Sequence, residues 1–126
     1  MLSSIKDYFF KTKEYDKALH WYLLAANQGY LFSQKNVAIM YNNGKGTDVN
    51  KEKALYWNTL IAEQGDVDAQ FKLGLLYRNE INDNDKAIYW YTLAAEHGHV
   101  DAQYNLALLY RNELKDNDKA IYWYTL

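Results

Sequence analysis

Residues 68–98 read DAQFKLGLLYRNEINDNDKAIYWYTLAAEHG, and their pattern of apolar residues indicates the fold most clearly. In its first part, four apolar side chains recur at i, i+4, i+7 and i+8, the spacing of one helix face: Ala69, Leu73, Leu76 and Tyr77. The spacing predicts a helix over residues 68–78. Frequent alanines and the lack of period-2 alternation argue against a strand.

The rest of the stretch predicts a second helix over residues 86–97. Four of its apolar residues fall at i, i+3, i+4 and i+7: Ala87, Trp90, Tyr91 and Ala94. Residues 79–85 are polar and are expected to form a connector whose aspartates cap the second helix. Gly98 follows where a helix end favours a left-handed residue. The first helix of such a pair is called an A helix below, and the second a B helix.

This helix pair recurs along the chain. Tryptophans stand at positions 21, 57, 90 and 123, with spacings of 36, 33 and 33 residues, and a Lys-Ala pair precedes each at the same offset. Residues 71–93 and 104–126 match at 18 of 23 positions. A helix pair cannot bury its apolar face alone, so such units stack into an array. The recurring tryptophans are therefore expected to be core residues. Small residues at one A-helix position are expected to let helices approach closely: Ala38, Gly74 and Ala107.

These residues resemble the Sel1-like repeat, a relative of the tetratricopeptide repeat. One unit carries most of the resemblance, through Ala69, Leu73, Gly74, Tyr77, Lys86, Ala87, Trp90, Tyr91, Ala94, Ala95 and Gly98. The loop at residues 43–47 is similar to the family's Gly-x-Gly loop, whereas Asn58 and Ile61 depart from the family pattern. The resemblance implies an all-α fold, a right-handed α–α superhelix (solenoid) of stacked antiparallel helix pairs.

The chain, residues 1–126, is expected to be a single Sel1-like repeat domain. It divides into a partial repeat over 1–29, repeats over about 30–65 and 66–98, and an incomplete repeat over 99–126. Both ends are expected to lie inside helices, so that the last helix exposes Ile121, Trp123 and Tyr124. We therefore expect a fragment of a longer repeat protein, or a C-terminal helix that packs on another copy.

The composition excludes several functional classes. The 126 residues include no cysteine, so neither disulfides nor thiolate metal sites can form. The net charge of −2 gives no broad attraction to nucleic acid or membranes. No stretch reaches the ~20 apolar residues of a membrane span, and no signal peptide is recognisable. These features predict a cytoplasmic protein, and export by a route without a classical signal stays open.

No catalytic, cofactor or metal site is expected. His97 and His99 flank a predicted helix–helix turn and are interpreted as solvated, because two histidines near Asp101 make a poor metal site. Residues 44–47 lack the spacing of a phosphate-binding loop. Four aspartates are interpreted as helix caps or favourable charges at helix starts: Asp83, Asp85, Asp116 and Asp118.

The related tetratricopeptide fold implies a concave groove lined by the A helices. Its expected lining is the set of A-helix positions that lie outside the repeat pattern and share one face, at i, i+3, i+7 and i+10. This predicts a protein-binding groove lined by Phe32, Lys35, Ile39, Asn42, Phe71, Leu75, Arg78, Tyr104, Leu108 and Arg111. Aromatic and arginine side chains are enriched in binding hot spots. Alternatively, the apolar members widen the core between adjacent A helices.

These patterns predict a non-enzymatic scaffold or adaptor that binds another protein or a peptide segment, without a cofactor, nucleic acid or membrane partner. The expected ligand is an extended or helical segment with apolar anchors and some acidic residues. The alternative is a self-assembling structural array, in which exposed terminal helices stack copies end to end and the C-terminal helix mediates self-association.

Overall fold

The structure, a computed structural model, describes residues 14–113 and 117–124 of the chain. Its contacts separate two compact units, one ending at Ile61 and the other beginning at Ala62. Helices joined by short connectors make up the described residues, and no strand occurs among them. The all-α class and the packing of consecutive helices are therefore confirmed.

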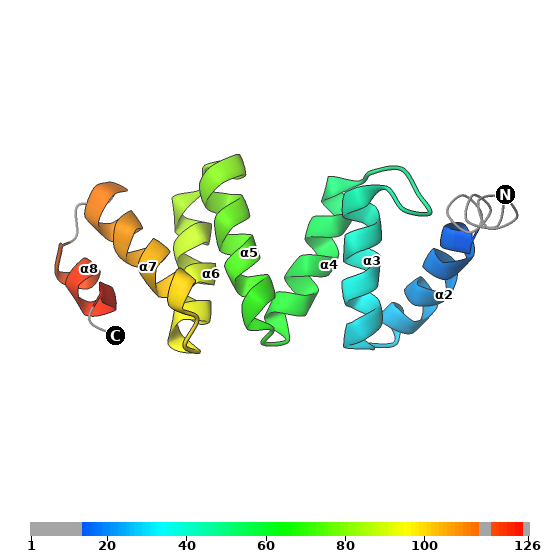
Figure 1. Ribbon diagram of the computed structural model, residues 1–126, viewed down its shortest axis with the longest axis horizontal. Coiled ribbons are helices and arrows are strands. Elements are labelled where there is room, and N and C mark those ends of the chain that lie inside the picture. Colours follow the sequence, from blue (N-terminus) through cyan, green and yellow to red (C-terminus); the bar gives the residue numbers. More distant parts are fainter. Residues whose placement is uncertain (1–13, 114–116, 125–126) are drawn as a thin grey trace, which may run out of the picture. The chain divides into compact units, whose positions relative to one another are not determined.

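The first unit contains α2 (Tyr15–Asn27), α3 (Leu31–Asn43) and α4 (Lys51–Glu63), whose last two residues belong to the second unit. Helix α2 packs on α3 (Figure 1). The buried apolar residues of α3 are Val37, Ala38, Met40 and Tyr41. Those of α4 include Ala54 and Trp57.

The loop between α3 and α4 approaches the start of α2 closely. Gly44 ends α3 in the left-handed region at φ 73°, and Gly46 follows at φ 74°. A Cβ at Gly46 would collide with the backbone of Tyr15. Both glycines therefore adopt left-handed conformations that other residues disfavour, and Gly46 also leaves room for the backbone of Tyr15. This agrees with the interpretation of the segment as a connector.

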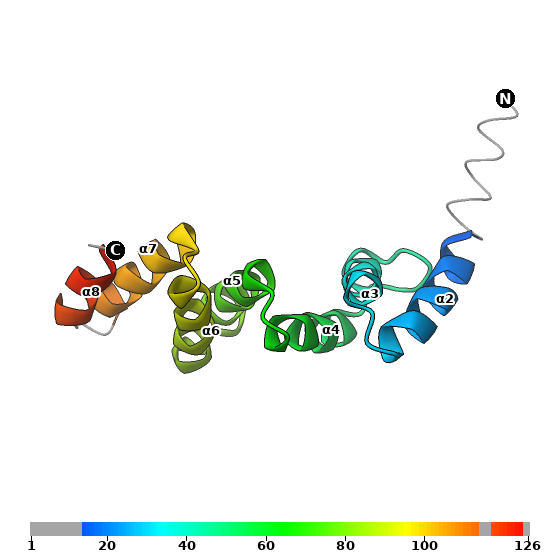
Figure 2. The same ribbon diagram turned by 90° about the horizontal axis from the view of Figure 1, so that it is seen from below.

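The second unit contains α5 (Val67–Leu76), α6 (Asn84–Glu96), α7 (Val100–Leu108) and α8 (Asn117–Tyr124), with π-helical turns η2 (Tyr77–Ile81) and η3 (Leu109–Glu113) extending α5 and α7. Helix α6 packs on both α5 and α7, and α7 packs on α8. Consecutive helices of this unit run in opposite directions (Figures 1 and 2). Tyr91, Leu106 and Leu109 are the largest side chains of its buried cluster.

The prediction that residues 79–85 form a connector is wrong for residues 79–81. The A helix continues as η2 through Ile81, and the chain turns at Asn82, which is left-handed at φ 62°. Asparagine tolerates this conformation, so it takes the place that Gly44 has in the longer loop. The Asp83 carboxylate accepts a hydrogen bond from the Lys86 N–H at 3.1 Å, which confirms its predicted role as a cap. Asp116 and the side chain of Asp118 lie outside the described residues.

The tryptophans do not all lie in the core. Trp57 and Trp90 are 6% exposed, as predicted, but Trp21 is 67% exposed. Helix α6 packs on both α5 and α7, and α2 packs on α3, so Trp90 and Trp21 lie on helices with different neighbours. Trp123 is half-buried against the core of the second unit, contrary to its predicted exposure, while Ile121 and Tyr124 are exposed as predicted. None of the described helices is long and apolar enough to cross a membrane.

Candidate protein-binding surface

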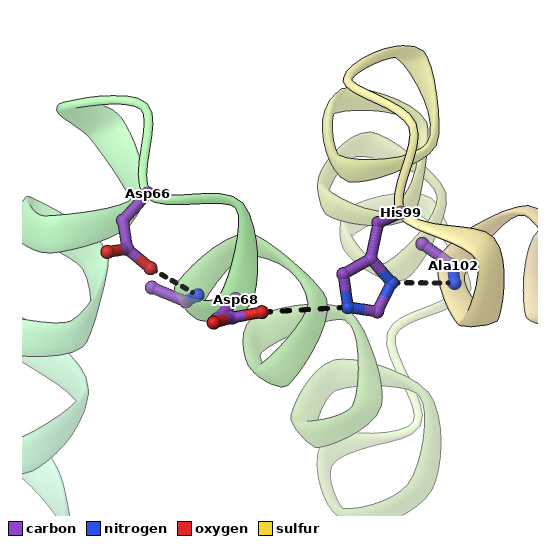
Figure 3. A network of polar contacts seen from close by, with 5 residues as sticks. Asp66, Asp68, His99 and Ala102 are labelled. Carbon is purple, nitrogen blue, oxygen red and sulfur yellow. Dashed lines mark hydrogen bonds and ion pairs between the residues drawn. The ribbon is translucent and has the colours of Figure 1, made fainter.

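The A helices begin at equivalent N-cap residues. Tyr30, Asp66 and His99 share nearly the same backbone conformation, with φ/ψ of −71°/111°, −71°/110° and −74°/107°. The Asp66 carboxylate accepts a hydrogen bond from the Ala69 N–H at 2.9 Å, and His99 Nδ1 accepts one from the Ala102 N–H at 3.1 Å (Figure 3). Tyr30 makes no side-chain cap. These caps fix where each A helix starts, and hence which residues share its exposed face.

His99 is not the solvated turn residue that its position predicts. Its ring stacks on Phe71 of the preceding A helix, with centroids 4.4 Å apart, and Nε2 lies 3.8 Å from Asp68 Oδ1 (Figure 3). Because Nδ1 accepts the capping hydrogen bond, the neutral ring carries its proton on Nε2, toward the carboxylate. His97 is exposed, as predicted, and its Nδ1 lies 2.7 Å from the Leu93 carbonyl oxygen.

A glutamine ties each A helix to the preceding B helix. The three side-chain amides donate to backbone carbonyls near the B-helix ends, in the pairs Gln34–Ala26 at 3.2 Å, Gln70–Ala62 at 3.1 Å and Gln103–Ala95 at 3.1 Å. Such a bond is local to the interface and holds the register of the two helices. Sequence reasoning missed it, although the glutamines recur at the same spacings of 36 and 33 residues as the tryptophans.

In three of the four repeats, the lysine of the Lys-Ala pair has a second role that the sequence pattern did not reveal. Its ammonium group lies over a tyrosine ring of the A helix in the same pair, within reach of a cation–π interaction. The distances from Nζ to the ring centroid are 5.2 Å for Lys53–Tyr41, 5.3 Å for Lys86–Tyr77 and 5.2 Å for Lys119–Tyr110. In these three repeats, the contact links the start of the B helix to the end of its A helix.

In the first unit, the predicted groove residues all lie on α3 and are all exposed. Phe32 is 75% exposed and Ile39 is 55% exposed. Lys35 is exposed as well. Asn42 is exposed but engaged, because its carbonyl and side-chain oxygens accept hydrogen bonds from Lys51 Nζ at 3.2 and 2.7 Å. Phe32 and Ile39 therefore present apolar surface, and Lys35 a positive charge, on the exposed face of α3.

In the second unit, the predicted groove residues divide between core and surface. Phe71 and Leu75 are half-buried and pack against the core cluster, as the alternative of a widened core expects. Tyr104 is 56% exposed, and its ring centroid lies 6.1 Å from that of Tyr124. The remaining members differ in exposure: Arg111 is exposed, whereas Arg78 and Leu108 are half-buried.

Arg78 also influences the core. Burial raises the pKa of the Tyr91 hydroxyl above its ordinary value, and the positive charge of Arg78 acts in the opposite direction. A change at Arg78 would therefore alter both the predicted groove and the electrostatic environment of the Tyr91 hydroxyl. Arg111, which is exposed, offers the cleaner test of the surface.

The titratable groups of the described residues do not form a constellation for metal binding. Among residues 14–113 and 117–124, no three His, Cys, Asp or Glu side chains gather closely enough to hold a metal ion. The contacts around His99 are the cap of α7, a ring stack on Phe71 and a 3.8 Å contact with Asp68 Oδ1, and the last two link the start of α7 to α5. The described surface presents exposed apolar side chains on helices whose register is held by the glutamine hydrogen bonds.

Known proteins share this architecture. Residues 10–30, 31–66, 67–99 and 100–126 each match the family described as Sel1 repeat. The crystal structure of c5321, a protective antigen present in uropathogenic Escherichia coli strains, is 34% identical over 88% of this chain, with a TM-score of 0.68. A Sel1 repeat protein from Oxalobacter formigenes is also 34% identical over 88% of the chain, with a TM-score of 0.67. The chain covers 25% and 34% of these two proteins, respectively. No curated protein is significantly similar to it in sequence.

Proposed function

The chain belongs to the Sel1 repeat family, and we propose that it binds a partner protein through the exposed faces of its A helices. Sel1 repeat proteins are generally non-enzymatic scaffolds for protein interactions. In such a scaffold, most side chains of each helix pair hold the array together, and the variable surface positions select the partner.

The observation that carries the proposal is the exposure of large apolar side chains on A helices. Phe32, Ile39 and Tyr104 are each more than half exposed. Burying such a side chain against a partner contributes roughly 1.5–3 kcal/mol. Exposed aromatic anchors on a rigid helix also lose little conformational entropy on binding, which favours affinity.

The charges beside these anchors indicate the chemistry of the partner. Lys35 and Arg111 are exposed members of the predicted groove, and Arg78 adds a half-buried positive charge. We propose a partner segment, extended or helical, that combines apolar anchors with acidic residues. Electrostatic complementarity of this kind speeds association and selects among partners more than it adds affinity.

Charge reversal tests this proposal. Arg78→Glu combined with Arg111→Glu is expected to abolish pull-down of such a partner, and Arg111→Glu alone should weaken it without disturbing the core near Tyr91. Glu96→Lys, which reverses an exposed charge on the B helix α6, serves as the control. Unchanged pull-down by the double variant would refute the assignment of the groove.

One observation favours the alternative, a self-assembling array. Helix α8 exposes Ile121, Tyr122 and Tyr124, at 59%, 57% and 42%. A cluster of this kind is a candidate contact between copies. Light scattering over a concentration series tests it: growth in mass that Ile121→Glu prevents would support assembly, and a strict monomer throughout would rule it out.

A further inference from the structure

The outer face of each A helix in the second unit carries opposite charges at its two ends. Each face reads acid, aromatic residue, leucine and arginine at the spacing i, i+3, i+7 and i+10. The two sets are Asp68, Phe71, Leu75 and Arg78 on α5, and Asp101, Tyr104, Leu108 and Arg111 on α7. The aspartates lie in the first turns of the helices, and the arginines lie in the π-helical turns that extend them.

Like charges of the two helices lie at the same end of the unit. Helices α5 and α7 are in contact and run in the same direction, since α6 runs antiparallel to both (Figure 1). At their starts, His99 Nε2 lies 3.8 Å from Asp68 Oδ1, yet 84% of the Asp68 side chain stays exposed. Arg78 and Arg111 follow ten residues after the aspartates, about 15 Å along the helices at 1.5 Å per residue. The face shared by α5 and α7 therefore has an aspartate end and an arginine end.

The fold does not require these charges. Acids in the first turn and bases in the last turn suit the helix macrodipole. Helix α3 nevertheless forms an A helix with Phe32 in the place of Asp68 and Asn42 in the place of Arg78. Both aspartates and Arg111 are exposed. The charges are therefore available to select a partner.

We infer that this face of the second unit binds an amphipathic helix of a partner protein, with basic residues at the aspartate end and acidic residues at the arginine end. Apolar side chains of the partner would cover Tyr104, which is 56% exposed, and the half-buried leucines beside it. A helix of three turns spans about 16 Å with its apolar residues on one side, whereas an extended segment turns every second side chain away. The inference rests on the proposed function and adds the charge pattern of the partner.

Selection from a library of displayed helices tests this charge pattern. Every helix in the library has the same apolar face, and the residues at its two ends are randomised among lysine, glutamate and serine. The parent chain should enrich helices with lysine at one end and glutamate at the other over helices with like charges. We expect a preference of about fivefold or more, because each mismatch replaces attraction with repulsion.

Variants of the aspartate end should change the selection in a defined way. Asp68→Lys combined with Asp101→Lys should enrich helices with glutamate at both ends. Asp68→Asn combined with Asp101→Asn is the milder change, and it should remove the preference for lysine without creating one for glutamate. Glu96→Lys reverses an exposed charge on α6 and should leave the preference of the parent chain unchanged. Tyr104→Asp should abolish enrichment, since it places a charge in the apolar centre of the face.

Three results would overturn the inference. The parent chain could enrich no helix, it could enrich helices regardless of their end charges, or the aspartate variants could leave the selection unchanged. Light scattering that showed a dimer of the parent chain, dissociated by the aspartate reversal, would also overturn it, because a second copy would then occupy the face. The proposed function is tested separately, by capture of a partner protein that depends on Phe32 and Tyr104. Successful capture without a charge preference would remove this inference alone.

Discussion

Gly74 shows how one missing atom sets the spacing of a helix pair. A Cβ at this position would lie 2.5 and 2.6 Å from two carbons of the Tyr91 ring, and Tyr91 is only 2% exposed. In the next repeat, Ala107 occupies the position of Gly74, and Tyr124 occupies the position of Tyr91. Tyr124 is 42% exposed, whereas Tyr91 also belongs to a buried cluster with Ala102 and Leu106 of the following helix.

We expect Gly74→Ala to destabilise the protein. Overpacking costs about 1–3 kcal/mol, whereas the better helix propensity of alanine contributes only about 1 kcal/mol. Because the enclosed Tyr91 ring cannot move aside, the steric cost should exceed the gain from helix propensity. We expect the free energy of unfolding, measured in urea, to fall by about 1 kcal/mol. In a Tyr91→Ala background the penalty should disappear. An equal penalty in both backgrounds would show that the ring is not its cause.

Tyr91 should make the fold sensitive to alkaline pH. Burial raises its pKa in the folded state, so the unfolded chain loses this proton first as the pH increases. The stability contributed by the neutral hydroxyl is fully present below about pH 10, the ordinary tyrosine pKa, and is lost as the pH rises from there through the folded-state pKa. Urea unfolding between about pH 8 and 11 should therefore show a decline that Tyr91→Phe makes shallower. Tyr89, which is 57% exposed, provides the control: if Tyr89→Phe had the same effect, burial would not be the cause.

At the scale of the element, the A helices differ in how they begin. Asp66 and His99 cap α5 and α7 with their side chains, whereas Tyr30 leaves α3 without a side-chain cap despite the same backbone conformation. The conformation is therefore already suitable for a cap at residue 30. Tyr30 is 65% exposed, so its replacement removes little packing.

Tyr30→Asp is expected to stabilise the protein by about 1 kcal/mol, and Asp66→Ala to destabilise it by a similar amount. Both changes can be measured by urea unfolding near neutral pH, where the carboxylate is ionised. Tyr30→Ala controls for loss of the ring and should bring no gain. Equal stabilities of Tyr30→Asp and Tyr30→Ala would contradict the capping argument.

The sequence predicted the elements well where local signals decide them. The helix pairs, the left-handed Gly98 and the Asp83 cap all depend on residues within one or two turns, and the structure contains each of them. The π-helical end of α5 was missed, because the mostly polar segment 79–85 resembles a connector even though the helix continues through its first three residues.

The surface was less predictable, because exposure depends on which helices meet. Trp21 and Trp90 occupy the same repeat position, yet only one is buried. Phe71 fits the helical face of the predicted groove, but it stacks on His99 and contributes to the core of its unit. Neither outcome follows from spacing along one helix. The recurring glutamines that tie A helices to B helices could have been found from their spacing, but their hydrogen-bond partners could not.

At the scale of the whole molecule, each of the two compact units presents an exposed aromatic residue on an A helix. Phe32 has this role in the first unit and Tyr104 in the second. Most other large side chains of the A helices serve the packing of helix pairs. The proposed scaffold therefore requires few residues for recognition, which explains why so regular a sequence identifies its fold more readily than its partner.

Quantitative affinity capture from a lysate of the source organism tests whether the exposed faces of the A helices bind a partner protein. The full chain is compared with a Phe32→Asp, Tyr104→Asp double variant and with Tyr89→Asp, which changes an exposed tyrosine on a B helix. We expect a protein that the parent chain and Tyr89→Asp both enrich and that the double variant does not, with all three equally folded by circular dichroism. The same proteins enriched to the same extent by all three would contradict it.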